Sequence, residues 1–439
     1  HNAAGPVVSP PSHAPAKAAD TPAVSQAPGP GSHAPKAAPG PTIAPGPDAT
    51  ATAPSSPSSS NTTKKHRSPP PPPPTAPGPE SSSGASADGD LDPSQVAALE
   101  ALDVNFTKSA PCRTPADILL CNSDRPSKLI ALSLQKCPKP ATLSVPALKN
   151  LTGLMVLEFI DCPMSPVKFP LSLIKTLDTL FVTESLGRTG TNEKAPRLPD
   201  TWIKQFVYLT HLAISEVEIS GKGLYPITQS LASLTNMTIS KASVAGVLPR
   251  NTWPSDVQYI DVSSNSIRGT IPSTLRNLAQ LKYLDFSNNQ LKGVIPNVFD
   301  SLNSMQHIDL HGNQLSGPIP GSVAMLYNCS HLDLSNNKLN GTIPSNITHL
   351  KALKYLDLSQ NSFTGEVPFN DTFIKQLKVL KLNDNMGLCY NHSAIKSKLL
   401  KGVADCAPVV SDFLASPAPA PSQDEVGSSS GRSSGVSKG

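Results

Sequence analysis

A repeat of fixed length constrains the fold of this chain more than any other feature of its sequence. Six asparagines, each closing a phrase of the form LxxLxLxxN, follow one another at intervals of 24 residues: Asn265, Asn289, Asn313, Asn337, Asn361 and Asn385. Weaker copies of the phrase end earlier in the chain, at Cys137, Cys162, Ser185, Val217 and Ala242. Together these make eleven units, with one longer interval of 32 residues between Ser185 and Val217. Such a period predicts a solenoid, because a single unit cannot bury its own apolar face.

The residues of one unit predict a short strand followed by a turn. Leu284 and Phe286 should point into the core, while Tyr283 and Asp285 alternate with them and point outward. The closing Asn289 falls where the chain leaves the strand, and its amide can satisfy backbone groups that would otherwise be buried without partners. We therefore interpret these asparagines as structural and not catalytic.

A second phrase follows the closing residue in the later units. It has the form Gly-x-x-Pro, and it begins at Gly246, Gly269, Gly293, Gly317, Gly341 and Gly365. This combination resembles the plant-specific leucine-rich repeat of receptor kinases, receptor-like proteins and polygalacturonase-inhibiting proteins. The resemblance implies an α/β solenoid: a right-handed leucine-rich-repeat superhelix with a concave parallel β-sheet, about 11 plant-type repeats and a cap at each end. We expect the first five units, which lack most of this phrase, to be less regular.

The two ends of the chain differ in composition from the repeats. Of the 47 prolines, 22 lie in the first 90 residues, among Ala, Ser and Gly. Such a segment buries too little apolar surface to offset its ordering entropy. We therefore predict a disordered Pro-rich stalk over 1–90, an N-terminal cap over 91–128, repeats over 129–388, a C-terminal cap over 389–406 and a disordered tail over 407–439. The stalk resembles wall glycoproteins of the arabinogalactan and extensin types, although a plain spacer has a similar composition.

The N-terminal cap should begin with a helix. Asp92 can act as N-cap, Pro93 suits the first helical position, and Gln95 completes a capping box. Val96, Leu99 and Leu102 then line one face of the helix. This helix resembles the cap of plant repeat proteins.

Seven cysteines indicate disulfides and at least one free thiol. The cap pairs Cys112–Cys121 and Cys389–Cys406 are the bridges that we predict. Cys137 and Cys162 occupy the closing position of adjacent coils; we expect buried free thiols there, although a bridge is geometrically conceivable. Cys329 replaces a core leucine and should remain reduced.

Glycosylation signals indicate secretion. Sequons occur at Asn61 and at the eight sites that we predict to carry glycans: Asn105, Asn150, Asn236, Asn328, Asn340, Asn346, Asn370 and Asn391. The chain has no signal peptide and no apolar run long enough to span a membrane. We expect a mature or trimmed extracellular chain of the apoplast or cell wall, the ectodomain of a single-pass plasma-membrane protein whose anchor lies outside this sequence.

Catalytic motifs are missing from the sequence. It contains no phosphate loop, metalloprotease helix, nucleophile elbow or zinc-type cysteine spacing, so we predict that the protein is not an enzyme and has no cofactor. A net charge of +4 over 439 residues does not indicate nucleic-acid binding.

Two outward rows of side chains are the candidate binding surface. One contains Tyr259, Tyr283, His307, His331 and Tyr355, and continues toward the N-terminus through Asn236, His211, Thr179, Val156 and Ala131. The other contains Asp261, Asp285, Asp309, Asp333 and Asp357, followed by Lys381. Parallel strands would place them side by side as exposed ladders suited to a peptide or sugar with basic or planar groups. Residues of these types are, however, also ordinary consensus for the repeat.

Three histidines, at positions 307, 311 and 331, fall on neighbouring coils. The sequence gives no sign of a closed ligand shell, so we predict no metal site. A change of charge at His307 and His331 between about pH 5 and 7 is the interpretation that we favour.

From about residue 91 to 406 the chain most resembles short plant receptor-like proteins, the kinase-less relatives of repeat receptor kinases. The resemblance rests also on the last repeat and cap, from Phe369 through Leu388 to His392. It implies a ligand sensor that binds a peptide, protein or wall-derived ligand and signals through a partner receptor kinase or co-receptor with leucine-rich repeats, in immunity or development. A contact with cell-wall polysaccharide is a further possibility. The alternatives are a secreted inhibitor of wall-degrading enzymes and a structural, extensin-like wall protein.

Overall fold

The computed structural model describes residues 90–104, 112, 119–137, 141, 143–162, 164–184, 197–391, 398–400 and 402–406. The predicted tail, the sequon at Asn105 and all of the predicted stalk except Asp90 lie outside these residues. In the part of the chain that is described, no helix combines the length and the apolar character that crossing a membrane requires.

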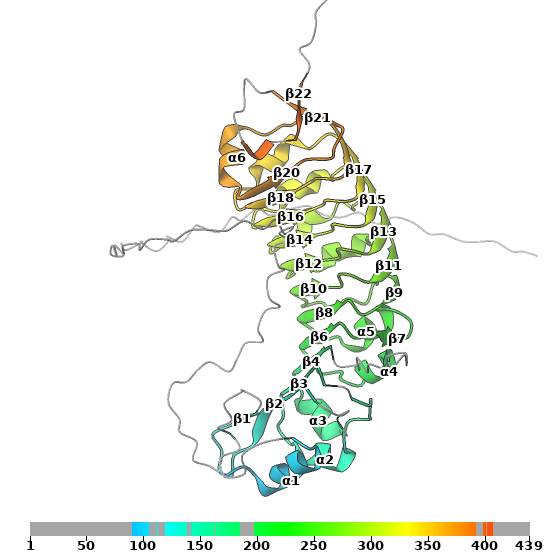
Figure 1. Cartoon of the computed structure of the whole chain (residues 1–439), viewed down its shortest axis with the longest axis vertical. Coiled ribbons are helices and arrows are strands. Elements are labelled where there is room, and N and C mark those ends of the chain that lie inside the picture. Colours follow the sequence, from blue (N-terminus) through cyan, green and yellow to red (C-terminus); the bar gives the residue numbers. More distant parts are fainter. Residues whose placement is uncertain are drawn as a thin grey trace, which may run out of the picture. The chain divides into compact units, whose positions relative to one another are not determined.

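One sheet of 12 strands runs through all the repeats, with one strand from each coil beside the next (Figure 1). The first strand pairs antiparallel with the second, and every later pair is parallel and in register. In order, the strands are β1 (Leu119–Cys121), β2 (Leu129–Gln135), β3 (Val156–Ile160), β4 (Thr179–Thr183), β6 (His211–Ser215), β8 (Asn236–Ser240), β10 (Tyr259–Asp261), β12 (Tyr283–Asp285), β14 (His307–Asp309), β16 (His331–Asp333), β18 (Tyr355–Asp357) and β20 (Val379–Lys381). We call this the inner sheet.

A second sheet has eight strands, and its first six each contain the glycine of one Gly-x-x-Pro phrase. Its strands are β9 (Ala245–Val247), β11 (Ser266–Gly269), β13 (Gln290–Gly293), β15 (Gln314–Gly317), β17 (Lys338–Gly341), β19 (Ser362–Glu366), β21 (Gly387–Tyr390) and β22 (Ala404–Asp405). Gly317 illustrates why glycine stands here: its φ is +78°, and a Cβ on it would lie 2.9 Å from Cγ1 of Val294 in the preceding coil. We call this the outer sheet. A separate pair, β5 (Leu198–Pro199) and β7 (Ile219–Ser220), lies next to the undescribed residues 185–196.

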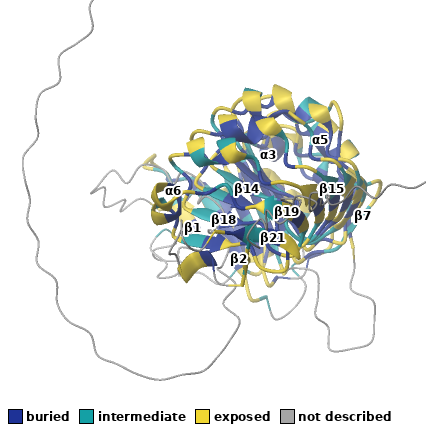
Figure 2. Cartoon of the chain, turned by 90° about the horizontal axis from the view of Figure 1, so that it is seen from above, coloured by how far each residue is buried: buried dark blue, intermediate teal, exposed yellow. Residues whose placement is uncertain are grey.

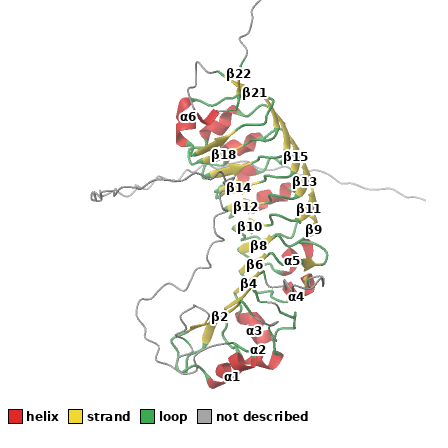
Figure 3. Cartoon of the chain, viewed as in Figure 1, coloured by secondary structure: helices red, strands yellow, loops and turns green. Residues whose placement is uncertain are grey.

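Short helices complete the coils, and Figure 3 shows them succeeding one another along the stack of strands. The α-helices are α1 (Pro93–Ala101), α2 (Val145–Asn150), α3 (Leu171–Thr176), α4 (Asp200–Ile203), α5 (Tyr225–Ser230) and α6 (Asp371–Gln376). The 3-10 helices are η1 (Ser273–Asn277), η2 (Phe299–Ser301), η3 (Gly321–Met325), η4 (Ser345–His349) and η5 (Lys398–Leu400). The N-terminal coils thus use α-helices where the regular coils use 3-10 helices, until α6 closes the array.

The core lies between the sheets and the helices, where buried residues gather in the view from above (Figure 2). The inward positions of the strands are almost fully buried: Leu284 is 1% exposed and Phe286 is 0% exposed. The third residue of the Gly-x-x-Pro phrase also packs inward, as Ile295 does. Each coil therefore contributes to one continuous apolar interior.

The closing asparagines form a ladder of hydrogen bonds between coils. The Nδ2 of Asn289 donates to the carbonyl oxygens of Phe286 and Ser287 in its own coil and of Val262 in the preceding one, at 2.9–3.1 Å. Its Oδ1 accepts the backbone N–H of Ile267 in the preceding coil at 3.0 Å. One side chain satisfies four buried backbone groups, which accords with the structural role that the sequence predicts.

The cap helix begins as predicted, but Gln95 does not form a capping box. Asp92 is the N-cap and accepts the N–H of Ser94 at 2.8 Å, whereas its own N–H donates to the Ser127 carbonyl at 2.9 Å. Gln95 is fully buried, accepts the N–H of Leu129 at 2.7 Å and donates to the carbonyl of Thr152 at 2.9 Å. Gln95 therefore joins the cap to the first two coils.

Three disulfides are present among the described residues. Two of them, Cys112–Cys121 and Cys389–Cys406, are the predicted cap pairs, and Cys329 is a buried free thiol. The third joins Cys137 to Cys162, so the expectation of free thiols at these positions is wrong. The parallel register of β2 and β3 brings the two Cα atoms to 4.6 Å, within the range that a disulfide spans.

Candidate functional site

Five aromatic side chains stack face to face along the inner sheet. Ring centroids of successive members lie 4.1, 4.2, 4.1 and 4.1 Å apart, with interplanar angles of 8–16°. The members are Tyr259, Tyr283, His307, His331 and Tyr355, and we call them the ring stack. The stack arises because these residues occupy the same position in five strands that pair in register.

Five aspartates run parallel to the ring stack, two residues further along each strand. They are Asp261, Asp285, Asp309, Asp333 and Asp357, and we call them the acidic row; Lys381 follows in register on β20. Both rows therefore have the order that the sequence predicts.

The aspartates also have a structural role that the sequence analysis missed. In each coil the carboxylate Oδ1 accepts the N–H of the residue two positions on, as Asp285 does from Ser287 at 2.8 Å and Asp333 from Ser335 at 2.9 Å. Asp333 and Asp357 also accept the hydroxyl of that serine at 2.6 Å. The recurring Asp-x-Ser spacing was the signal available, because a short acidic side chain commonly bonds to its own backbone two residues on.

The rows are less exposed than we expected. Tyr259 and Tyr283 are each only 8% exposed, and Asp285 is 6% exposed, because strands so close together place each side chain against its neighbours. His307, His331 and Tyr355 are half-buried and offer more accessible surface. The accessible part of the site is thus its C-terminal portion.

Burial and mutual repulsion raise the pKa values in the acidic row. Burial, with repulsion from Asp309 and Asp261, raises the pKa of Asp285 to about 8. Burial, with repulsion from Asp309 and Asp357, raises the pKa of Asp333 to about 6. A row of carboxyls that resist ionisation will favour any cation that compensates their charge.

Lys381 is such a cation within the chain. Its Nζ donates to Oδ2 of Asp357 at 2.8 Å and to the hydroxyl of Tyr355 at 3.2 Å, and it lies 5.4 Å from the centroid of the Tyr355 ring. A cation on the next coil is thus held by one aspartate and one ring together.

The histidines behave differently from the prediction. Burial lowers the pKa of His307 to about 3 and also lowers the pKa of His331, so the expected change of charge at His307 between about pH 5 and 7 is wrong. At His311, burial lowers the pKa, but the hydrogen bond and attraction to Asp309 outweigh it and the net shift is upward. Nδ1 of His311 lies 2.6 Å from Oδ1 of Asp309, and its Nε2 lies 3.0 Å from the amide nitrogen of Asn288. His311 is therefore the histidine that an acidic partner stabilises in its charged form.

The described sequons lie on the surface, and one of them lies on the inner sheet. Asn236 stands in register with Tyr259 and is half-buried. Asn346 is also half-buried, and the exposed sites are Asn150, Asn328, Asn340, Asn370 and Asn391. Asn370 serves in addition as the N-cap of α6, where its side chain accepts the N–H of Phe373 at 2.8 Å. Glycosylation at these positions remains a prediction.

Comparisons with known proteins agree with this architecture. A family model described as "Leucine rich repeat" matches residues 255–315, and one described as "Leucine Rich Repeat" matches 328–350 and 352–370. Receptor-like protein 55 of Arabidopsis thaliana is 34% identical over 197 residues, which are 43% of this chain and 44% of that protein. The chain carries leucine-rich repeats, and it is similar in part to a plant receptor-like protein. The match spans less than half of that relative's length.

Solved structures resemble this leucine-rich-repeat protein in fold. A plant ice-binding protein gives a TM-score of 0.54 at 19% identity, covering 73% of this chain and 99% of that one. The ectodomain of the receptor kinase GASSHO1/SCHENGEN3 from Arabidopsis thaliana, in complex with CASPARIAN STRIP INTEGRITY FACTOR 2, gives a TM-score of 0.48 at 22% identity, covering 64% of this chain and 31% of that one. At 19% identity, the likeness to the ice-binding protein concerns the fold alone.

Proposed function

We propose that this chain is the extracellular, non-enzymatic part of a plant receptor-like protein, and that it binds a peptide or protein ligand through the ring stack and the acidic row. The observation that carries the proposal is the register of the two rows, which aligns five rings with five carboxyls on one sheet. The similarity to Receptor-like protein 55 supports the same class. Signalling would then pass through a partner receptor kinase with leucine-rich repeats, in immunity or development.

The chemistry of the rows favours a ligand with basic groups. Lys381 already occupies the position beside Asp357 and Tyr355. The neighbouring Asp333 has no lysine beside it in the acidic row, and the half-buried edge of His331 lies next to it. A lysine or arginine of a ligand would there gain a carboxylate beside the edge of the His331 ring, whose two faces are covered by His307 and Tyr355.

The candidate surface has two limits. A glycan on Asn236 would stand beside Tyr259 and prevent a ligand from lying across that coil. At the other end, Lys381 repels a further basic group. The proposed surface therefore extends from Tyr259 to Tyr355.

Binding of short peptides tests the proposal. Calorimetric titration of the glycosylated chain should give measurable affinity for a penta-arginine peptide and none for a penta-glutamate peptide. Tyr355→Ala should remove about 2 kcal/mol or more of binding free energy, as expected for an aromatic anchor, and Tyr283→Ala should do the same. Tyr355 is the cleaner test, because Tyr283 is buried within the stack.

Val156→Ala is the matched control, since Val156 lies in the same row on β3 and is half-buried, but beyond the Asn236 sequon. It should leave the affinity unchanged. Equal affinity for both peptides, binding of an oligogalacturonide in place of the basic peptide, or intact binding after both tyrosine changes would contradict the proposal.

A further inference from the structure

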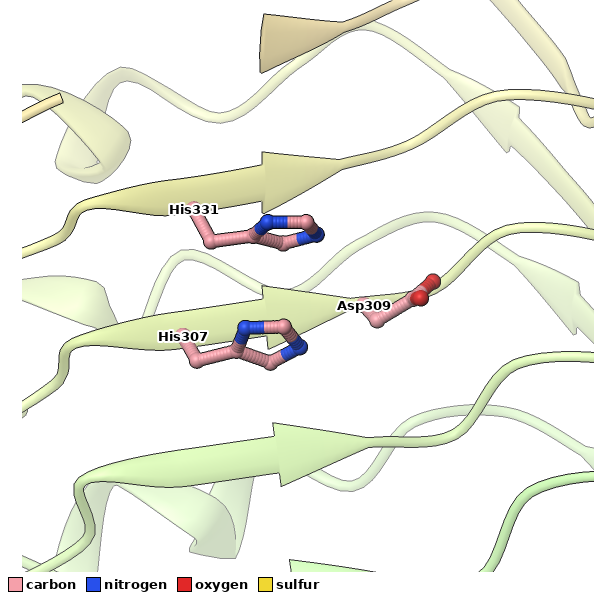
Figure 4. Close-up of side chains that lie close together, drawn as sticks. All are labelled: His307, Asp309 and His331. Atoms are coloured by element: carbon pink, nitrogen blue, oxygen red, sulfur yellow. The ribbon is translucent and has the colours of Figure 1, made fainter. Parts of the chain in front are cut away.

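Two histidines and one aspartate converge in the middle of the candidate site: His307 and Asp309 are the first and last residues of β14, and His331 is the first residue of β16. One ligand atom from each of His307, Asp309 and His331 lies within 4.8 Å of the other two. In Figure 4 the far ends of both imidazole rings point toward the side on which the Asp309 carboxylate lies. The sequence placed these three residues in the two neighbouring rows but predicted no metal site, because it gave no sign of a closed ligand shell.

The Nε2 atom of His307 is the observation that singles out this cluster. It is buried and has no hydrogen-bond partner among the described residues. A buried polar atom without a partner costs about 1–3 kcal/mol, so such atoms are rare in folded proteins unless a ligand or ion satisfies them. Nε2 is also the atom through which a neutral imidazole commonly binds a metal.

We propose that His307, Asp309 and His331 form a binding site for a divalent transition-metal ion such as Zn2+. Two imidazoles and one carboxylate are the donor set that zinc accepts when three ligands come from the protein and a fourth position stays open. All three residues are partly exposed, and the Asp309 side chain is 14% exposed, so an ion can enter from the solvent side of the inner sheet. The fourth position would face the same solvent.

The stacked rings can reach this geometry by a small movement. Tetrahedral zinc at about 2.0–2.1 Å from each donor needs donor atoms about 3.3 Å apart. In this structure the three donor atoms lie within 4.8 Å of one another. Rotation of the imidazoles about χ2, a torsion with broad minima, tilts the two Nε2 atoms toward each other. Tyr283 and Tyr355 close the stack on both sides and limit the other movements of the pair.

A second cluster shares Asp309 but is already occupied by hydrogen bonds. It comprises Asp309, His311 and Asp333. Both ring nitrogens of His311 have partners, Asp309 on one side and Asn288 on the other. Oδ1 of Asp309 is engaged by His311, which leaves its Oδ2 for an ion beside His307 and His331. The geometry therefore assigns the metal to the ring pair and not to His311.

Titration of the EDTA-treated full chain with ZnCl2, followed by calorimetry, tests this proposal and does not depend on any ligand of the receptor. The double variant His307→Gln/His331→Gln should lose one zinc equivalent that the unmodified chain binds. Loss of a residue that only holds a metal ligand in place weakens metal binding by about 10–100-fold, so each single histidine variant should weaken that site at least as much. Titration with CoCl2 should give the visible d–d absorption of a tetrahedral site, absent from the double variant.

Two control variants locate the site. His349→Gln, on the exposed surface of η4, should leave the zinc affinity unchanged. His311→Gln, which removes a hydrogen-bond partner of Asp309, should weaken the affinity by about 10–100-fold at most and keep the zinc equivalent. A cooperative melting transition of every variant without metal separates loss of a ligand from loss of the fold. The proposal is overturned if the double variant binds as much zinc as the unmodified chain, or if His311→Gln removes the site and His307→Gln does not.

Discussion

The N-terminal and C-terminal coils share one inner sheet but are held together by different chemistry. In the inner sheet, strands β3, β4, β6 and β8 have five residues each, whereas β10, β12, β14, β16, β18 and β20 have three. The outer sheet begins only with β9, and the asparagine ladder begins only at Asn265. Earlier coils have buried apolar residues at the closing position, such as Val217 and Ala242, or the disulfide Cys137–Cys162.

The aspartates explain why the strands differ in length. In the C-terminal coils the N–H of Ser263 donates to Asp261 and not to the neighbouring strand. Nδ2 of Asn265 donates to the carbonyl oxygen of Ile239 at 2.6 Å. In the N-terminal coils Ser133, Glu158, Phe181, Ala213 and Thr238 stand in the aspartate row, and the strands continue. A side chain that accepts a hydrogen bond from a nearby backbone N–H removes that N–H from the pairing between strands, so the strand ends there. The residues that regularise the C-terminal coils are thus the same ones that form the acidic row.

Removing the Cys137–Cys162 disulfide should produce the largest change in stability, and only in the N-terminal coils. It closes a loop of 25 residues, so Cys137→Ser/Cys162→Ser should cost about 3–4 kcal/mol by chain entropy. Because each coil contacts only its neighbours, hydrogen exchange should accelerate in β2 to β4 and stay unchanged in β14 to β18. Equal acceleration along the whole sheet would mean that the two regions unfold as one unit.

Breaking the asparagine ladder should destabilise the C-terminal coils by a smaller amount. Asn313→Ala removes the acceptor for the N–H of Leu291 and the donor to the carbonyls of Phe286 and Leu310. These groups are buried, so the expected loss in urea denaturation is about 2–3 kcal/mol. The matched control is Asn277→Ala, an exposed asparagine at the end of η1, which should change stability by less than about 0.5 kcal/mol. A similar midpoint for both variants would show that packing alone holds the regular coils.

The glycine of the Gly-x-x-Pro phrase offers a third comparison. Gly317→Ala should cost about 1–2 kcal/mol, because φ is +78° and the new Cβ meets Val294. Gly321→Ala, four residues on in η3, has no positive φ and nothing within 4 Å of the new Cβ. It should be neutral or slightly stabilising. Thermal melting of the two variants checks this difference, and a Gly317→Ala protein as stable as Gly321→Ala would remove the backbone argument for the phrase.

The acidic row should produce the smallest effect, visible as a dependence on pH. The pKa of Asp285 is raised to about 8 in the folded protein, above its unfolded value of about 4, so the folded state binds the proton more tightly. This stabilisation is complete below about pH 4 and is lost as the pH rises through about 8.

Asp285→Asn should therefore reduce the fall in melting temperature between pH 5.5 and 8.5, the range in which the folded state loses this proton after the unfolded state has already lost it. Asparagine keeps an oxygen to accept the N–H of Ser287. Asp256→Asn, on an exposed aspartate outside the row, should leave the fall unchanged. An identical pH dependence in the Asp285 variant would indicate that the row is not coupled to folding.

The sequence by itself determined the repeat, the register and the order of both rows. A 24-residue period places equivalent residues in equivalent positions of every coil, so Tyr283 must lie beside His307, and Asp285 beside Asp309. It also determined the asparagine ladder, since one residue type at the turn can satisfy groups of two coils. Because the pattern is local and repeats without change, the repeat and both rows can be predicted without knowledge of distant contacts.

Only the tertiary structure decided how those residues behave. The distance between strands turned a row of rings into a stack, buried Tyr283 and Asp285, and lowered the pKa of His307 to about 3. It brought Cys137 within bonding distance of Cys162. It also directed the side chain of Gln95, which lies in α1, to the backbone of the first coils. Burial and pairing depend on the distances between atoms of neighbouring coils. The repeat period determines which residues are neighbours, but it does not determine these distances.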